Sequence, residues 1–227
     1  AKIQTKRMVE KMKRIRKSFI VSMCLLTAFV LWTVAICFVD VRAIGPQGSS
    51  VGFAGINGFV HNLTGVHWGL YNITDWLGLV PIFVCMGFSI LGLIQWIKRK
   101  SICKVDYDIL VLGGFYIVTI AVYLLFESVV INYRPVLIGG SLEASYPSST
   151  TMLVMCVMPT AIMQFGNRIK NKVLRNIVVV TIIAFIAFMV IGRLICGVHW
   201  FTDIVGGALL SAGLVMMYHS LSNLKTK

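Results

Sequence analysis

A histidine and an aspartate four residues apart, His199 and Asp203, are the pair in this 227-residue chain best suited to nucleophilic chemistry. On a helix this spacing places both side chains on one face, so Asp203 can accept the proton of one ring nitrogen and leave the other as a free lone pair. The pair therefore predicts a nucleophile or base with its orienting group. A capping pair in which the two side chains merely satisfy each other is the alternative.

Two arginines and a helix start could provide an anion site beside this pair. Arg193 lies at the end of an apolar run, and Arg134 is followed by Pro135, which we expect to end a helix. Each guanidinium offers a planar fork for phosphate oxygens, although each could instead be an interfacial anchor. In the stretch YPSSTT, Ser148 or Ser149 could cap a helix whose N–H groups face an anion, or form only an ordinary N-cap.

Membrane helices must position these residues, because the chain is too apolar for a soluble domain. It is 58% hydrophobic and 13% charged, with a mean hydropathy of +0.87. A helix needs about 20 largely apolar residues to cross a bilayer. The runs that qualify are roughly Phe19–Val39, Leu77–Ile97, Tyr107–Ile131, Thr150–Phe165, Ile177–Ile195 and Thr202–Leu221. We predict an all-α polytopic membrane protein with six transmembrane helices in one bundle.

The basic residues predict the orientation of this bundle. Of 21 Lys and Arg, eight lie within residues 1–17, four within 98–104, four within 168–175, and two are Lys225 and Lys227. These segments alternate along the six-helix path, so the positive-inside rule places them and both termini in the cytoplasm. The net charge of +13 is thus explained by orientation and contact with anionic lipid, and no nucleic-acid partner is expected.

Two regions are expected along the chain. Residues 1–18 form a basic cytoplasmic N-terminal segment, and residues 19–227 form the six-helix domain, with a Gly- and aromatic-rich outer segment at about residues 40–76. All six cysteines lie in or beside apolar runs without metal-ligand spacing, so we expect neither a metal nor another cofactor. Nothing in the sequence predicts the oligomeric state.

The outer ends of the third to sixth helices should bring the polar residues together. A charged side chain at membrane depth costs roughly 2.5 to 3.5 kcal/mol on insertion scales, so its presence there predicts a functional site. Two guanidiniums, a helix N-terminus and the His-Asp pair on the same side suit one tetrahedral dianion.

The chain resembles the type 2 phosphatidic acid phosphatase superfamily, which includes lipid phosphate phosphatases and is related to vanadium haloperoxidases. That family carries Lys, six residues, Arg-Pro; then Pro-Ser-Gly-His; then Ser-Arg, five residues, His, three residues, Asp. The third motif is present here as Arg193, His199 and Asp203 with the correct spacing, and Gly192 replaces its serine.

The first two motifs are kept in part. Arg134–Pro135 and Pro147–Ser148 match the family. The substituted positions are Glu127 for the lysine, Ser149 for the glycine and Thr150 for the histidine.

The resemblance implies a role for each matched residue. His199 would attack phosphorus in line to give a phosphohistidine, and Asp203 would orient it. Arg134, Arg193 and the Ser148–Ser149 region would hold the phosphate oxygens. The family's second-motif histidine donates a proton to the departing alkoxide, which a threonine cannot do. Such a loss typically costs about 10²- to 10⁴-fold, unless the leaving group is already stable as an anion.

This argument predicts an enzyme that hydrolyses a lipid phosphate or diphosphate at the extracytoplasmic face. Polyprenyl diphosphate is favoured over phosphatidic acid, because its leaving group is a phosphate with a pKa of about 6. The expected location is a bacterial plasma membrane, with membrane lipids as further partners. A headgroup phosphotransferase, or a noncatalytic protein that binds or transports lipid phosphate, is the alternative.

Three further residues could take part. His67 and Asp75 of the outer segment could supply the missing acid if this segment folds over the site. Glu127 should lie two turns deeper than Arg134 on the same helical face. It could pair with an arginine, act as a donor when protonated, or contact a cationic headgroup.

Overall fold

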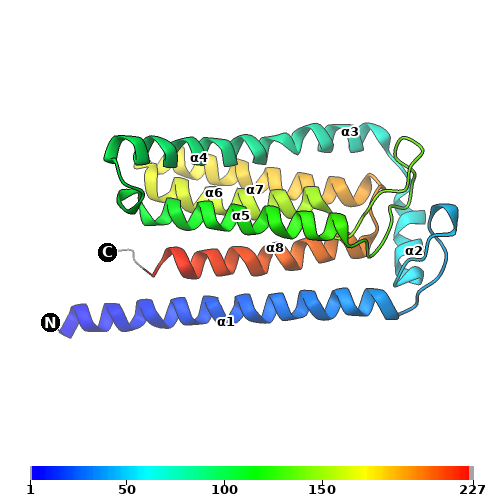
Figure 1. Ribbon diagram of the computed structural model, residues 1–227, viewed down its shortest axis with the longest axis horizontal. Helices are drawn as coiled ribbons and strands as arrows, with labels where there is room; N and C mark the ends of the chain where they lie inside the picture. Colours follow the sequence, from blue (N-terminus) through cyan, green and yellow to red (C-terminus); the bar gives the residue numbers. More distant parts are fainter. Residues whose placement is uncertain (1, 225–227) are drawn as a thin grey trace.

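The computed structural model describes residues 2–224, which form a bundle of long helices with smaller elements at one end (Figure 1). The elements in chain order are α1 (Lys2–Phe38), η1 (Pro46–Gly48), α2 (Ala54–Thr64), α3 (Trp68–Leu77), α4 (Leu79–Arg99), η2 (Ile102–Lys104), α5 (Tyr107–Ser128), α6 (Ser149–Arg168), α7 (Lys172–Ile195) and α8 (Phe201–Ser222). Within the described residues β-structure is limited to isolated bridges between loop residues.

Among residues 2–224, six helical stretches are long and apolar enough to cross a membrane. They are Met8–Phe38, Trp68–Arg99, Tyr107–Ser128, Ser149–Arg168, Lys172–Ile195 and Phe201–Ser222. The all-α fold with six membrane-spanning helices is therefore confirmed. In Figure 1, α1 begins and α8 ends at the same end of the bundle, as an even number of crossings requires.

Two of these helices extend further than their apolar runs. α1 includes the basic N-terminal residues and continues past residue 18 without a break. Gly78 adopts helical angles (φ −60°, ψ −17°), so α3 and α4 join into one stretch of 32 residues. At 1.5 Å per residue this stretch is about 48 Å long, more than a bilayer core of about 30 Å. The second membrane helix thus begins at Trp68 rather than at the predicted Leu77.

Helices α6 and α8 form the centre of the bundle. About half of each is buried, whereas the other spanning helices expose most of their apolar side chains to their surroundings, as lipid contact requires. α8 packs on α1, α5 and α6, and the main core includes buried side chains from all four helices. The N-terminal ends of α6 and α8 are therefore held in fixed positions.

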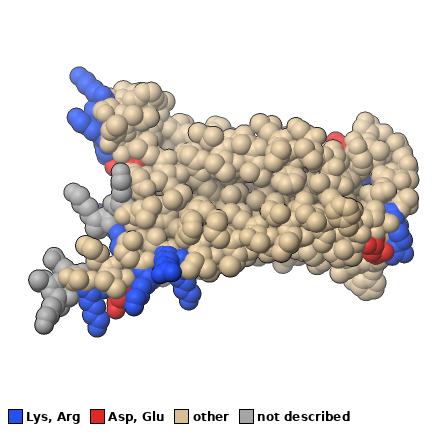
Figure 2. Space-filling view, turned by 60° about the horizontal axis from the view of Figure 1, so that its bottom comes forward, with Lys and Arg blue, Asp and Glu red and all other residues tan. Residues whose placement is uncertain are grey.

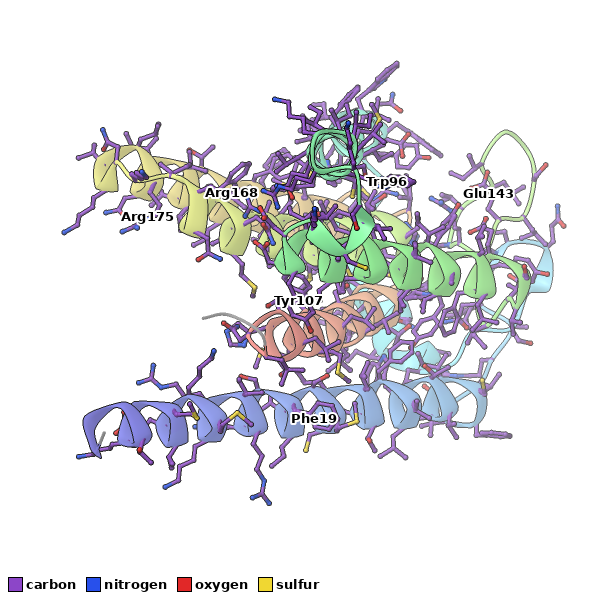
Figure 3. All side chains as sticks on the ribbon, turned by 60° about the vertical axis from the view of Figure 1, so that its left-hand side comes forward. Phe19, Trp96, Tyr107, Glu143, Arg168 and Arg175 are labelled. Carbon is purple, nitrogen blue, oxygen red and sulfur yellow. The ribbon has the colours of Figure 1, made fainter. Side chains whose placement is uncertain are left out.

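The charges divide the bundle into two different ends. Figure 2 shows Lys and Arg gathered mainly at one end, with a small basic and acidic group at the other. Figure 3 places Arg168 and Arg175 toward the basic end and Glu143 in the long loop at the opposite end. Lys225 and Lys227, two of the predicted cytoplasmic cations, lie outside the described residues.

The outer segment is folded against the α7–α8 connection. Asn57 of α2 is buried, and its amide donates to the Thr202 hydroxyl at 2.9 Å and accepts from the Thr202 backbone N–H at 3.1 Å. The backbone N–H of His67 donates to the carbonyl of Cys196 at 3.0 Å. Gly197 has φ +69°, and a Cβ there would overlap the carbonyl oxygen of Gly65, so the two backbones touch.

Candidate active site

His199 lies in the short connection between α7 and α8, where its ring is buried with 3% exposure. Its Nε2 is 3.2 Å from Nη2 of Arg193, and its Nδ1 is 3.1 Å from the hydroxyl of Ser145. Both ring nitrogens therefore have named partners, one on α7 and one on the loop before α6.

Asp203 lies in the first turn of α8 and is fully buried. Its Oδ2 accepts hydrogen bonds from the Trp200 backbone N–H at 2.9 Å and from the Ser145 hydroxyl at 2.5 Å. Its Oδ1 accepts a longer hydrogen bond from Asn132 Nδ2 at 3.4 Å. A buried carboxylate needs such donors, because desolvation otherwise opposes its charge.

The predicted direct hydrogen bond between His199 and Asp203 on one helical face is wrong. Nδ1 and Oδ2 are 4.0 Å apart, too far for a hydrogen bond. His199 precedes the first residue of α8, Phe201, so the pair does not share a helical face. The hydroxyl of Ser145 occupies the position between them.

Arg193 is in the last turn of α7 and is the largest fully buried side chain, with 1% exposure. Besides His199, its guanidinium contacts three residues of α3. Nη1 is 3.4 Å from the Thr74 hydroxyl and 3.7 Å from Asp75 Oδ1, and the group lies over the Tyr71 ring at 5.0 Å. Nε has no hydrogen-bond partner among the described residues.

Arg134 lies in the loop between α5 and α6, and the prediction that it stands at a helix end is wrong. α5 ends at Ser128, so Glu127 and Arg134 do not share a helical face. Arg134 Nε is 3.2 Å from Glu143 Oε2, an ion pair whose geometry is not that of a hydrogen bond. Nε and Nη1 thus keep their hydrogens for another acceptor.

Two segments of this loop pair with each other and set the positions of its polar side chains. The Arg134 N–H donates to the Glu143 carbonyl at 3.0 Å, and the Ser145 N–H donates to the Asn132 carbonyl at 2.9 Å. Trp200 Nε1 donates to the carbonyl of Tyr133 at 2.7 Å and joins the pairing to the start of α8. Asn132, Arg134 and Ser145 are thereby brought to His199 and Asp203.

Ser148 is the N-cap residue of α6, as predicted, but its hydroxyl makes no capping hydrogen bond. Its backbone N–H donates to the Asp203 carbonyl at 3.1 Å, and its buried hydroxyl has no partner among the described residues. The free N–H groups of the first turn of a 20-residue helix add to this site. Ser149, the first residue of α6, lines the adjoining cavity.

A cavity of about 590 Å³ opens beside these residues. Its polar wall includes Arg134, Glu143, Ser145, Ser149 and His199. The rest of the lining is Tyr123, Phe126, Glu127, Val130, Tyr133, Leu142, Ala144, Tyr146, Pro147 and Met152. The cavity thus combines polar side chains, including His199, with apolar ones from α5, the α5–α6 loop and α6.

The substituted motif positions have different surroundings. Glu127 is exposed and lines the cavity. Thr150 is not among the lining residues, and its methyl group lies toward Gly78, where an added Cβ would be 3.6 Å away. At Gly192 an added Cβ would come within 2.8 Å of Thr74 Cγ2, so the family's serine would require Thr74 to shift.

The two predicted auxiliary acids are separated by the structure. Asp75 is exposed but lies beside Arg193, at the edge of the site. His67 is exposed, and its Nε2 is 2.8 Å from the Thr64 carbonyl within its own loop. Only Asp75 is thus joined to the other predicted residues by a contact.

Burial lowers the pKa of His199 well below its usual value, and the positive charges of Arg134 and Arg193 lower it further. A hydrogen bond from the ring to the backbone of Ser145 opposes this shift. At neutral pH the imidazole is therefore neutral, and one of its two ring nitrogens is unprotonated.

Several residues of the site could not be found from motif spacing. Ser145 and Asn132 contact Asp203, and Tyr71 and Thr74 contact Arg193. Ser145 lies only three residues before Ser148, but this spacing alone does not predict a contact with His199 or Asp203. The loop pairing brings Ser145 to them. Within the described residues, no group of three or more His, Cys, Asp or Glu is placed to hold a metal ion.

The fold and the site together define a polytopic membrane protein with a buried histidine near two arginines at one end of the bundle. The sequence matches the family model of the PAP2 superfamily over residues 4–227, and the chain therefore belongs to this superfamily. This confirms the resemblance seen in the motifs.

A solved structure with a similar fold is the crystal structure of a transmembrane PAP2 type phosphatidylglycerolphosphate phosphatase from Bacillus subtilis. The two chains are 17% identical with a TM-score of 0.61, and the match covers 88% of this chain and 93% of that chain. No curated protein matches the chain. Family membership and the shared fold support a membrane phosphatase.

Proposed function

We propose that this protein is a lipid phosphatase or diphosphatase that removes a phosphate through a phosphohistidine on His199. The observation that carries the proposal is a set of unused hydrogen-bond donors around this ring. Arg134 Nε and Nη1, Arg193 Nε and the Ser148 hydroxyl are buried without partners among the described residues. Buried polar groups rarely remain unsatisfied, so these donors favour a ligand rich in acceptors.

The charge balance favours a phosphate as that ligand. Arg193 is buried and its nearest carboxylate, that of Asp75, is exposed and 3.7 Å away. Arg134 has one partly exposed carboxylate, that of Glu143. Asp203 is already engaged by three donors. A tetrahedral dianion would accept from both guanidiniums and from Ser148 at once, in a low-dielectric site where such hydrogen bonds are strong.

The reaction follows from the position of Nε2. When phosphate oxygens take over the hydrogen bonds of Arg193, the Nε2 lone pair is free to attack phosphorus. The P–N bond forms as the bond to the leaving oxygen breaks, and the leaving group departs with the electron pair. Water then attacks the phosphohistidine, breaks the P–N bond, returns the electron pair to Nε2 and releases phosphate and a proton. Arg134 and Arg193 stabilise the charge on the equatorial oxygens throughout.

The leaving group is the basis for favouring a diphosphate. Thr150 occupies the position of the family's histidine and, as a threonine, supplies no acid near neutral pH. Attack on the terminal phosphorus of a lipid diphosphate expels a lipid monophosphate, whose second pKa is about 6, so no proton is needed. The alkoxide that leaves from phosphatidic acid would need a proton. Without a general acid, we expect its hydrolysis to be about 10²- to 10⁴-fold slower.

The cavity and the charge distribution support a lipid substrate on the extracytoplasmic side. Phe126, Val130 and Met152 add apolar side chains to the largely polar lining of the cavity. The site lies at the end opposite the basic loops (Figures 2 and 3), and the positive-inside rule assigns that end to the outside.

Phosphate release from polyprenyl diphosphate by the purified protein tests the proposal. We expect His199→Ala to lower kcat on the order of 10³-fold or more, because it removes the nucleophile. His219→Ala, a histidine near the opposite end of α8, is the matched control and should retain activity. Because acid hydrolyses the P–N bond of a phosphohistidine, the reaction should be stopped with alkali before the intermediate is measured.

Other outcomes would contradict hydrolysis. Phosphate release that persists in His199→Ala would remove the assigned nucleophile. Transfer of phosphate to an added lipid or alcohol acceptor, with little free phosphate, would indicate a phosphotransferase. Tight binding of lipid phosphate without turnover would indicate a noncatalytic protein.

A further inference from the structure

Ser145 connects the two residues that the third motif was expected to connect directly. Its Oγ is 3.1 Å from His199 Nδ1 and 2.5 Å from Asp203 Oδ2, while the imidazole and the carboxylate remain 4.0 Å apart. The residue is 2% exposed, so no bulk solvent competes for these contacts.

The donors and acceptors in this chain allow only one arrangement when the imidazole is neutral. Arg193 has no acceptor atom, so its Nη2 must donate to Nε2, which is therefore unprotonated. The ring proton is then on Nδ1, which donates to Ser145 Oγ. The serine hydrogen in turn donates to Asp203 Oδ2, which can only accept while ionised.

We propose that Ser145 is a positioning residue. It links the carboxylate of Asp203 to His199 through two hydrogen bonds and holds the ring as the Nδ1–H tautomer. The Nε2 lone pair is then directed at the phosphate site. As positive charge develops on the ring during attack, the Nδ1–H···Oγ–H···Oδ2 chain stabilises it at both links. This inference rests on the proposed function, since it assigns Nε2 as the nucleophile.

The backbone keeps Ser145 in register with the ring. Its N–H is bonded to the Asn132 carbonyl at 2.9 Å, and the neighbouring Tyr146 is 1% exposed. Tyr146 stacks on Phe29 at 6.1 Å and its hydroxyl is 2.7 Å from the Thr33 hydroxyl of α1. The serine is thus held from both sides, as a relay requires.

Charged groups from every neighbouring element affect the ring. Arg193 of α7 and Arg134 of the α5–α6 loop contribute positive charge, and Asp203 of α8 acts through Ser145. Asp75 and Glu143 lie beside the two arginines. Burial and both arginines lower the pKa of His199, whereas the hydrogen bond that Nδ1–H donates to Ser145 Oγ, which itself donates to the Asp203 carboxylate, favours the protonated ring. Loss of this hydrogen bond should move the acid limb of kcat/KM to lower pH, because the free enzyme then stays neutral further into acid.

The test compares Ser145→Thr with Ser145→Val, two variants of nearly the same shape that differ in the hydroxyl. On the substrate that the wild type hydrolyses, we expect Ser145→Val to lower kcat about 10- to 10²-fold with a smaller change in KM, as for the outer partners of metal-bound histidines. Ser145→Thr should recover most of kcat and the wild-type pH profile. Ser145→Ala gives the same comparison with the wild type if the larger side chains prevent folding.

Equal kcat and equal acid limbs in Ser145→Thr and Ser145→Val would overturn the relay and leave only a packing role. The imidazole ¹⁵N chemical shifts of the resting protein provide a second measurement that needs no activity. At neutral pH we expect His199 as the Nδ1–H tautomer in the wild type, and a changed Nδ1 chemical shift in Ser145→Ala, which lacks the hydroxyl that accepts from Nδ1–H. An Nε2–H tautomer in the wild type would overturn the proposal. A wild type without hydrolase activity but with the Nδ1–H tautomer would contradict only the proposed function.

Discussion

Two arginines near His199 have N–H donors for which the described residues supply no hydrogen-bond acceptor. Arg193 is 1% exposed and its Nε is unpartnered, and Arg134 keeps both Nε and Nη1 unpartnered. Unsatisfied buried donors reduce stability, so this arrangement is costly until an anion arrives. The same donors are then already in position, which avoids reorganisation at the moment of reaction.

The role of Arg134 can be tested against an arginine at the same end of the molecule. We expect Arg134→Gln to lower kcat/KM for the phosphate substrate about 10²- to 10³-fold, because one charged donor to the phosphate oxygens is lost. Arg42→Gln is the control, since Arg42 is largely exposed and paired with Asp40. Initial rates of phosphate release measure both. Equal losses in the two variants would indicate a general effect of charge rather than a phosphate contact.

The sequence could predict those site residues that lie close together in the chain. Arg193, His199 and Asp203 lie within one helix–turn–helix connection, so their spacing carries geometric information. Ser145 and Asn132 depend on pairing between two loop segments, which no short-range pattern indicates. The 4.0 Å gap between His199 and Asp203 was missed for a different reason, because the helix begins only after His199.

At the scale of single elements, apolar runs predicted the membrane helices well and their ends less well. The run after Ser128 continues as Val129, Val130 and Ile131, so hydropathy could not show that α5 had already ended. Hydropathy also could not show that α3 and α4 join at Gly78, whose φ and ψ are helical. In both cases backbone conformation, which hydropathy does not report, decided the boundary.

The close approach of α8 to the α5–α6 loop gives a prediction for Gly206. A Cβ at this position would overlap the ring of Tyr146, which is held by Phe29, Phe126 and Thr33 and cannot move freely. We expect Gly206→Ala to destabilise the protein by about 1–3 kcal/mol, as overpacking does in well-packed cores. Thermal unfolding in detergent measures the change.

Gly114→Ala on α5 is the matched control for this prediction. No other atom lies within 4 Å of its added Cβ, so stability should be unchanged or slightly higher. Adding Tyr146→Leu to Gly206→Ala should restore part of the lost stability by removing the overlapping ring atoms. Equal unfolding temperatures for Gly206→Ala and the wild type would show that α8 does not pack as closely as described.

For the whole molecule, the two chemically different ends predict how the bundle lies in the membrane. Cys103 is exposed in the basic connection between α4 and α5, and Ser141 is exposed in the α5–α6 loop at the other end. A membrane-impermeant maleimide should label Ser141→Cys in intact cells when it is the only cysteine. A chain retaining only Cys103 should be labelled after permeabilisation alone. The reverse pattern would place the phosphate site in the cytoplasm.

Helix α1 packs mainly on α8, although four other membrane-spanning helices separate the two in the chain. Ser22 of α1 bonds the Gly213 carbonyl, Trp32 bonds the Thr202 carbonyl, and Thr33 reaches Tyr146 beside the site. During synthesis α1 enters the bilayer long before α8 leaves the ribosome. Its polar side chains therefore lack their α8 partners until then, and the proposed phosphate site can form only after α8 has been translated.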